Sequence, residues 1–246
     1  MSPQDIASIE RATLAAVSPA EVLDLGDWLV ALDPGTIRRA ASAVPLTHSL
    51  VADPAMFDRI DEAFASRGLR TAFRLPDVPG LAGLAGLLSA RGLVSEQPTL
   101  VKVCDLKDVA ALAEPAETLN APDKAWGRVF LSEGFDPVDG ANRVAALSRS
   151  PDALYGRVRA GVETVAVGVG AYAEDWVSFH GMRTEKSHRG QGHAARILST
   201  LARAGLDRGM TRGFLQVEEA NAGARSLYRK AGFERAWTYR YWSRPA

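Results

Sequence analysis

A strand, a glycine-bearing loop and an amphipathic helix follow one another from Trp176 to Leu206, and this order constrains the fold more than any other stretch. The strand ends near Met182, and the loop after it carries Gly190 and Gly192. The helix then places apolar side chains at helical spacing, as expected for a helix that packs one face on a sheet. Glycines let backbone amides approach a ligand closely, and a helix N-terminus carries about half a positive charge. The stretch therefore predicts an anion site, of the kind that holds phosphates, at the end of a strand.

The loop differs from two common phosphate-binding loops. It has no Gly-Lys-Ser/Thr at Walker spacing, and it lacks the third glycine and the downstream acid of a dinucleotide-binding turn. It resembles the coenzyme A loop of the GNAT superfamily of N-acetyltransferases, Arg/Gln-x-x-Gly-x-Gly/Ala. The matching residues are Arg189-Gly190-Gln191-Gly192-His193-Ala194.

A second segment resembles the same superfamily at the expected distance along the chain. Residues 213–217 read as a short buried strand, and Asn221, Leu227-Tyr228 and Gly232-Phe233 follow at the superfamily's spacing. The two motifs together extend from Trp176 to Phe233. The resemblance implies an α/β fold with an α+β mixed sheet, that of the acyl-CoA N-acyltransferases.

The N-terminal half contains the outline of a repeat of this pattern. Arg67-Gly68 parallels Arg208-Gly209 at an offset of 141 residues, and Gly92 parallels Gly232 at an offset of 140. Any two strand–helix pairs that end in glycine would share part of this pattern. The similarity therefore has two interpretations, a true repeat or the common form of such pairs.

The first copy of the repeat lacks the chemistry of the second. Leu88 stands where the second copy has Tyr228, and residues 42–49 replace the glycine loop. The sequence thus predicts a tandem GNAT fold with a degenerate N-terminal module at residues 1–107, a linker at 108–124 and a catalytic module at 125–246. The N-terminal module is expected to serve packing or to shape the acceptor site.

Three local predictions depend on residue type alone. Residues 37–44 are expected to be extended, and Trp126–Leu131 is expected to be a strand. The alternating aromatic residues of Trp237–Trp242 predict an edge or hairpin strand at the end of the chain.

The resemblance implies acetyl-CoA as cosubstrate and a primary amine as acceptor, with direct attack of the amine in a ternary complex. The pyrophosphate would lie on the amides of residues 190–194, and the pantetheine arm would pair with the strand edge at 182–184. The expected coenzyme A-binding residues are Met182, Arg183, Thr184, Arg189, Gly190, Gln191, Gly192, His193, Ala194, Asn221 and Tyr228.

Acetyl transfer also needs a proton donor and a way to deprotonate the amine. The resemblance implies Tyr228 as the donor to the leaving thiolate. A lysine-type amine, with a pKa of about 10.4, is mostly protonated at neutral pH, so a base or a water relay is expected. His180 is the first candidate for the base, before Glu219 and Glu163, although His180 also fits a packed strand residue. Asn221 fits a helix cap, a cofactor contact or both.

Composition limits the partners. Twenty-nine basic and 29 acidic residues give a formal net charge of zero, which argues against a nucleic-acid binder with a broad basic face. The single cysteine, Cys104, allows no internal disulfide.

Charges interrupt the N-terminal segment and no apolar run reaches membrane-spanning length, so a cytoplasmic protein without membrane contact is expected. His188 and His193 lack the context of a metal site, so no metal is expected.

Three functions are compatible with these residues. The first is an N-acetyltransferase, and the second is a non-catalytic acetyl-CoA-binding or sensor protein, against which the retention of Tyr228 argues. The third is a tRNA-dependent aminoacyl transferase, which the neutral charge disfavours. The acceptor stays open among small amines, antibiotics, peptides and proteins, because acceptor pockets are built from loops. Monomer and homodimer are equally compatible with the sequence.

Overall fold

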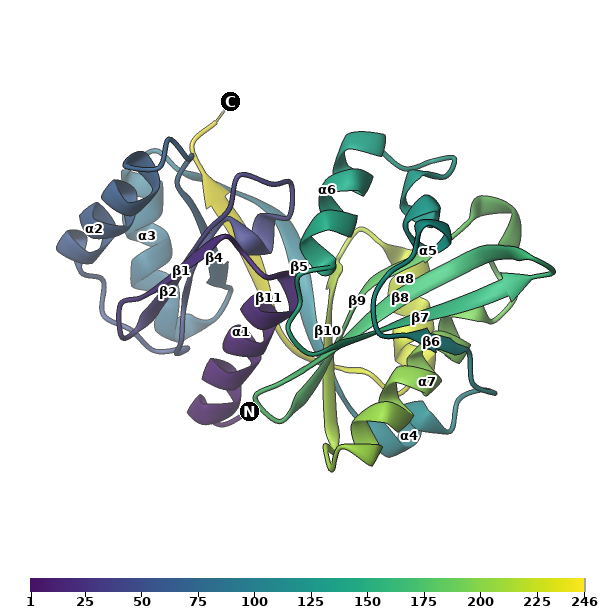
Figure 1. Ribbon diagram of the computed structural model, residues 1–246. Helices are drawn as coiled ribbons and strands as arrows, with labels where there is room; N and C mark the ends of the chain where they lie inside the picture. The colour runs from purple at the N-terminus through teal and green to yellow at the C-terminus, as the bar shows by residue number, and fades with distance from the viewer. Residues whose placement is uncertain (246) are drawn as a thin grey trace.

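The computed structural model describes residues 1–245, and their strands form one mixed sheet of eleven strands (Figure 1). The predicted α/β class with a mixed sheet is therefore confirmed. In spatial order the strands are β1 (Glu21–Asp24), β2 (Trp28–Leu32), β3 (Ala43–Pro45), β4 (Ala72–Pro76), β11 (Glu234–Ser243), β5 (Val94–Asp105), β10 (Arg212–Glu218), β9 (Trp176–Thr184), β8 (Glu163–Ala173), β7 (Ala153–Ala160) and β6 (Glu117–Leu119).

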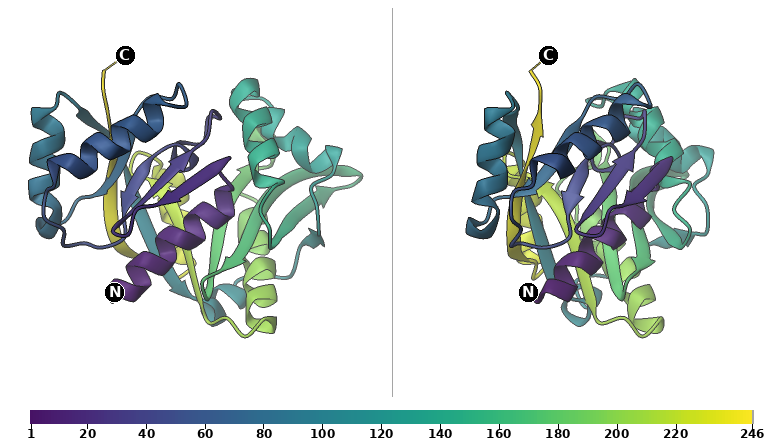
Figure 2. Two further views of the ribbon diagram at one scale, coloured as in Figure 1. Left: turned by 60° about the vertical axis from the view of Figure 1, so that its left-hand side comes forward. Right: turned by 90° about the vertical axis from the view of Figure 1, so that its left-hand side faces the viewer.

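The helices gather at the two ends of this sheet. Helices α2 and α3 lie at one end and α5 to α8 at the other, with α1 between them (Figures 1 and 2). Within residues 1–245, no helix combines the length and the apolar character needed to cross a bilayer. The α-helices are α1 (Pro3–Val17), α2 (Pro54–Ala65), α3 (Ala82–Ala90), α4 (Leu106–Ala110), α5 (Lys124–Arg128), α6 (Pro137–Leu147), α7 (His193–Asp207) and α8 (Ala222–Lys230); the 3₁₀ turns are η1 (Arg38–Ala40), η2 (Pro79–Leu81), η3 (Val129–Leu131) and η4 (Lys186–His188).

The two halves of the chain repeat one order of elements and exchange one strand each. The order β3, α2, β4, α3, β5 recurs as β9, α7, β10, α8, β11, and β3–β4 and β9–β10 are both parallel pairs. Strand β11 lies between β4 and β5, whereas β5 lies between β11 and β10. Each half thus completes the sheet of the other, and the boundaries at 107 and 125 remain a prediction. The expected linker contains β6 and the end of α4.

Two local predictions were wrong for identifiable reasons. The expected strand Trp126–Leu131 is helical, because the Asp123 carboxylate accepts the Trp126 amide at 2.8 Å and starts α5. Its aromatic side chains then pack inward, with Trp126 fully buried beside Phe130 and Tyr155. The C-terminal strand β11 is central rather than an edge, since both its neighbours pair with it antiparallel.

The expected extended stretch at residues 37–44 is only partly extended. It begins with the 3₁₀ turn η1, and the strand β3 starts only at Ala43. The turn η1 contains two arginines, Arg38 and Arg39.

Alternating residues of β9 and β10 face different helices. Val177 and Phe179 belong to the apolar core beneath α7 and α8, whereas Trp176 packs with the residues of α1. On β10 the Gln216 Nε2 donates to Thr13 Oγ1 of α1 at 2.9 Å. His180 follows the parity of Trp176 and therefore lies on the α1 face of the sheet.

A buried ion pair ties α1 to the N-terminal strands. Glu10 of α1 and Arg74 of β4 are 1% and 0% exposed in their side chains, and they form the pair that joins these elements. The Arg74 guanidinium also lies 5.2 Å from the centre of the Tyr239 ring. Burial raises the pKa of Glu10 even beside this guanidinium. The two charges are therefore buried away from water, and each compensates the cost of burying the other.

Removal of one member of this pair is expected to destabilise the protein strongly. Glu10→Ala should lower the free energy of unfolding by about 3–5 kcal/mol, because it leaves the Arg74 charge buried and unpaired. Arg11→Ala, on the same helix, removes the half-exposed Arg11–Asp24 pair and should lower it by less than about 1 kcal/mol. Urea unfolding followed by tryptophan fluorescence measures both. Similar losses from the two variants would show that the buried pair has no special role.

Candidate active site

The parallel strands β9 and β10 pair at their start and then separate. Pairing extends from Trp176 with Arg212 to Phe179 with Leu215, and within residues 1–245 no later pairing joins the two strands. Strand β9 remains paired with β8, and β10 remains paired with β5. The separation therefore leaves one backbone edge of each strand facing a common opening.

A β-bulge directs the end of β9 into this opening. Gly181 and Met182 together oppose the single residue Gly168 of β8, which shifts the register by one. Gly181 has a φ of 60°, a conformation that favours glycine. A side chain at Gly168 would collide with the Met182 sulfur, so this glycine makes room for the methionine. The two glycines thus explain how Met182 and Arg183 reach the opening.

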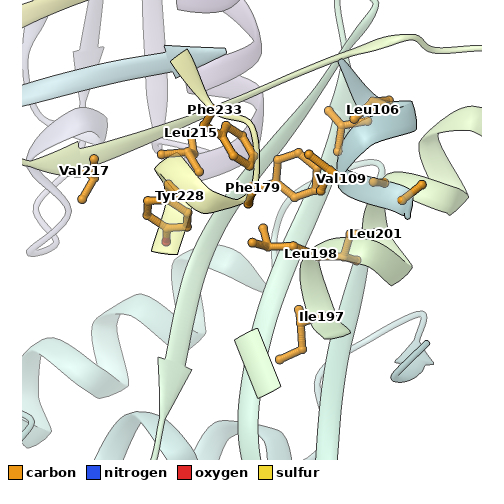
Figure 3. Close-up of a cluster of buried hydrophobic side chains, with 14 of the residues drawn as sticks. Leu106, Val109, Phe179, Ile197, Leu198, Leu201, Leu215, Val217, Tyr228 and Phe233 are labelled. Atoms are coloured by element: carbon orange, nitrogen blue, oxygen red, sulfur yellow. The ribbon is translucent and has the colours of Figure 1, made fainter. Parts of the chain in front are cut away.

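A cleft of about 420 Å³ occupies the opening between the strands. Tyr228 reaches it from the core beneath α7 and α8, where its hydroxyl points away from the cluster (Figure 3). His180 reaches it from the α1 face of the sheet. Because both side chains line one cleft, the cleft gives access to both faces of the sheet. Of the residues predicted from sequence, it is lined by His180, Met182, Arg183, Asn221 and Tyr228.

The N-terminus of α7 has no side-chain cap. Its N-cap is Gly192, and Gly192 and Gly190 have φ values of 79° and 77°. Within residues 1–245, the first backbone amide of the helix to find a backbone acceptor is that of Arg196, which donates to the Gly192 carbonyl. The amides before it are free to bind an anion. The side chains of Ser2, Asp53, Asp136 and Asn221 cap α1, α2, α6 and α8, whereas α3, which begins after Leu81, also lacks a side-chain cap.

Side chains of the loop hold its shape rather than fill its anion site. Arg189 Nε donates to the Thr184 carbonyl at 3.2 Å, and Gln191 Nε2 donates to the Ser187 carbonyl at 3.4 Å. Burial lowers the pKa of His193. Loop residues 189–194 follow β9 beyond the cleft lining, and His193 and Ala194 lie in the first turn of α7.

Tyr228 is 8% exposed, and its ring lies 5.8 Å from that of Phe233. Burial raises the pKa of Tyr228 to about 12, although the nearby Arg183 charge acts in the opposite direction. The hydroxyl is therefore protonated at neutral pH, as a proton donor must be.

His180 is buried and neutral. Its Nδ1 lies 3.2 Å from Ser178 Oγ, and its Nε2 is buried with no hydrogen-bond partner within residues 1–245. Burial, reinforced by the Arg39 charge, lowers the pKa of His180 to about 3. A small cavity of about 20 Å³ adjoins this side chain, which is room for one water molecule.

The other residues predicted for catalysis lie in different places. Glu219 is exposed and is absent from the cleft lining, whereas its neighbour Glu218 lines the cleft. Glu163 is exposed at the start of β8 and lies 3.8 Å from Arg128. Asn221 caps α8, since its Oδ1 accepts the Ala224 amide at 3.0 Å, and it also lines the cleft.

About three quarters of the residues that line the cleft were not predicted from the sequence. Most of them come from η1, β5, α6, β10 and β11, which are far apart in the chain. One local signal existed, because Gln216 interrupts an otherwise apolar strand. The residues missed in this way include Arg38, Arg39, Gln97, Thr99, Arg143, Gln216, Glu218, Tyr239 and Tyr241. Within residues 1–245, no three His, Cys, Asp or Glu side chains gather as a metal site would require.

A comparison with protein families decides what kind of protein carries this cleft. A family model described as "Probable histone acetyltransferase Rv0428c C-terminal" matches residues 3–242. The chain belongs to this family. The match extends over the N-terminal half as well, whereas the two sequence motifs cover only residues 176–233. The match to the Rv0428c C-terminal family thus confirms that the chain resembles the GNAT acetyltransferases, as the two sequence motifs predicted.

Solved structures show the same fold. A GCN5-related N-acetyltransferase from Kribbella flavida is 20% identical with a TM-score of 0.72, and the match covers 98% of this chain and 96% of that chain. One from Sphaerobacter thermophilus is 17% identical with a TM-score of 0.63, covering 100% and 95%. A tandem GNAT protein from the clavulanic acid biosynthesis pathway is 12% identical with a TM-score of 0.61, covering 100% and 98%. Among curated proteins no match was found.

Proposed function

We propose that this family member is an acetyl-CoA-dependent N-acetyltransferase that passes the acetyl group directly to a primary amine in a ternary complex. The observation that carries the proposal is the opening between β9 and β10. The unpaired edges of the two strands and the Tyr228 side chain border this opening. The uncapped N-terminus of α7 follows the end of β9 along the chain.

The residues present fit the parts of acetyl-CoA. The free amides at residues 190–194 suit the pyrophosphate, which a helix N-terminus attracts. The edge of β9 at Met182–Thr184 pairs with no strand on the side of the opening and suits the amides of the pantetheine arm, which can pair with it as an added strand does. The side chains of Arg183 and Arg189, which donate to the Met182 and Thr184 carbonyls, would then give way. The thioester would then lie between the strands beside Tyr228.

In the reaction a nitrogen–carbon bond forms, the carbon–sulfur bond of the thioester breaks, the nitrogen loses a proton and the sulfur gains one. Tyr228 is positioned to donate to the sulfur, and the Arg183 charge beside it favours this donation. His180 remains neutral, so its role is to accept a hydrogen bond or to hold a water that relays the proton. Because the cleft gives access to both faces, the amine can enter from the α1 face.

The N-terminal half, in contrast, is unsuited to a second acetyl-CoA. Helix α2, the counterpart of α7, is capped by the Asp53 carboxylate and begins with Pro54, so it offers a negative charge and fewer amides. The loop after β3 closes on Gly80, where the Leu50 amide donates to the Gly80 carbonyl at 3.3 Å. We propose that this half shapes the acceptor side of the cleft.

The pH dependence of the rate tests the proton assignments. At saturating acetyl-CoA, kcat/KM for the amine should rise with pH toward the pKa of the acceptor, because the unprotonated amine attacks. With its pKa lowered to about 3, His180 is neutral throughout this range and adds no inflection near pH 6.5. Tyr228, with a pKa of about 12, adds no falling limb below about pH 10.

The same kinetic measurements distinguish the alternatives. Intersecting initial-rate patterns support the ternary complex, whereas parallel patterns indicate an acetylated enzyme. An inflection near pH 6.5 that disappears in His180→Gln would make His180 a titrating base and contradict the assignment above. Tight binding of acetyl-CoA without turnover of any amine would favour a sensor.

A further inference from the structure

Arg39 is a cation of the cleft without a counter-ion. It lies in η1, borders both the cleft and the small cavity beside His180, and within residues 1–245 forms no ion pair and no hydrogen bond. The neighbouring arginines differ. Arg38 pairs with Glu96 at 2.8 Å and donates to Gln97 at 2.9 Å, while Arg143 pairs with Asp139 at 2.6 Å.

The surroundings of Arg39 carry a surplus positive charge. The Arg39 charge acts on the buried carboxylate of Glu10, but Glu10 already pairs with Arg74 and forms no ion pair with Arg39. The charge of Arg39 reaches the cleft, because it contributes to lowering the pKa of His180. The floor of the cleft on the α1 face therefore combines a neutral imidazole with one guanidinium that lacks an anion.

The lining of the same cleft also carries a carboxylate that no cation neutralises. Glu218 of β10 accepts a hydrogen bond from Gln97 Nε2 at 2.7 Å, and within residues 1–245 no cation lies within ion-pair distance of it. Gln97 is itself held by Arg38, so Glu218 is oriented without being neutralised. One cleft thus presents an unpaired guanidinium and an unpaired carboxylate.

We propose that the acceptor is a small amine that carries a carboxylate, bound with its carboxylate on Arg39 and its amine toward Glu218 and His180. This inference depends on the proposed N-acetyltransferase function and specifies its substrate class. A guanidinium binds a carboxylate through two parallel hydrogen bonds, which gives orientation as well as affinity. A lysine in a basic peptide offers no anion to Arg39 and would meet several further arginines of the lining.

The test compares matched acceptors. Free L-amino acids are assayed beside their carboxamides, their decarboxylated amines and a lysine-rich histone-tail peptide, with release of free coenzyme A as the readout. We expect kcat/KM for the carboxylate-bearing members to exceed that of their carboxamides by about 10- to 100-fold.

Variants at Arg39 locate the cause of this preference. Arg39→Gln should raise KM for the carboxylate-bearing acceptor by about 10- to 100-fold and abolish the preference, while KM for acetyl-CoA stays unchanged. Arg39→Lys keeps the charge but not the planar fork and should retain part of the preference. Arg59→Gln, an exposed arginine on α2, is the control and should change neither constant.

The possible results test the substrate class, the cofactor and the proposed function separately. A preference for carboxamides, simple amines or the histone-tail peptide overturns the inference, as does an unchanged preference in Arg39→Gln. Binding of acetyl-CoA without turnover of any carboxylate-bearing amine overturns it too, yet leaves the cofactor assignment intact. Failure to bind acetyl-CoA overturns the proposed function itself.

Discussion

Gly192→Glu is expected to weaken acetyl-CoA binding by at least about 100-fold. The substitution places a carboxylate at the N-cap of α7, where the free amides would meet the pyrophosphate, and like charges repel there. A Cβ at this position meets no atom within 4 Å, so the side chain does not disturb the packing. Calorimetric titration of acetyl-CoA into the variant measures the loss.

A matched control separates this charge from backbone strain. Gly192 has a φ of 79°, where a non-glycine residue costs about 1–2 kcal/mol. Gly209, just beyond the other end of α7, also has a φ of 79° and no atom within 4 Å of a built Cβ. Gly209→Glu therefore carries the same strain far from the anion site and should bind acetyl-CoA as the wild type does. Equal losses in the two variants would contradict the assignment.

Tyr228→Phe is expected to lower kcat by about 100-fold and leave acetyl-CoA affinity unchanged. The substitution removes one hydroxyl and keeps the ring that packs on Phe233. With a pKa of about 12, Tyr228 donates to a thiolate of pKa about 8.5 against a gradient of about 5 kcal/mol, so a hydrogen bond to the sulfur carries much of the effect. Steady-state kinetics with acetyl-CoA titrated separately measures both quantities.

Tyr172→Phe supplies the comparison. Tyr172 belongs to the same apolar core, and its hydroxyl donates to the Leu201 carbonyl at 3.1 Å, away from the cleft lining. It should lose some stability and keep kcat. If Tyr228→Phe turns over like the wild type, the proton reaches the sulfur by another route.

The segment from Trp176 to Phe233 could be predicted from sequence because its signals are local. The order is a strand that ends near Met182, a loop with Gly190 and Gly192, and then a helix. Each of these elements can be recognised from the residues of its own segment. Tyr228 reaches the cleft for the same reason, since α8 follows β10 after a short turn.

The remainder depends on contacts between distant segments. The aromatic alternation of β11 shows that it is a strand, yet only the exchange with β5 makes it central. Arg39 and Glu218 enter the same cleft from positions far apart in the chain. Glu219 was predicted, but its neighbour Glu218 at the end of β10 lines the cleft, because a shift of one residue along a strand changes the side to which a side chain points.

The most direct measurement is calorimetric titration of acetyl-CoA into the wild-type protein. Saturable binding of one molecule per chain is expected, because α7 has an uncapped N-terminus with two left-handed glycines and α2 has an aspartate cap. Two sites per chain would contradict the silent role of the N-terminal half. Absence of binding would contradict the central claim that the opening between β9 and β10 is an acetyl-CoA site.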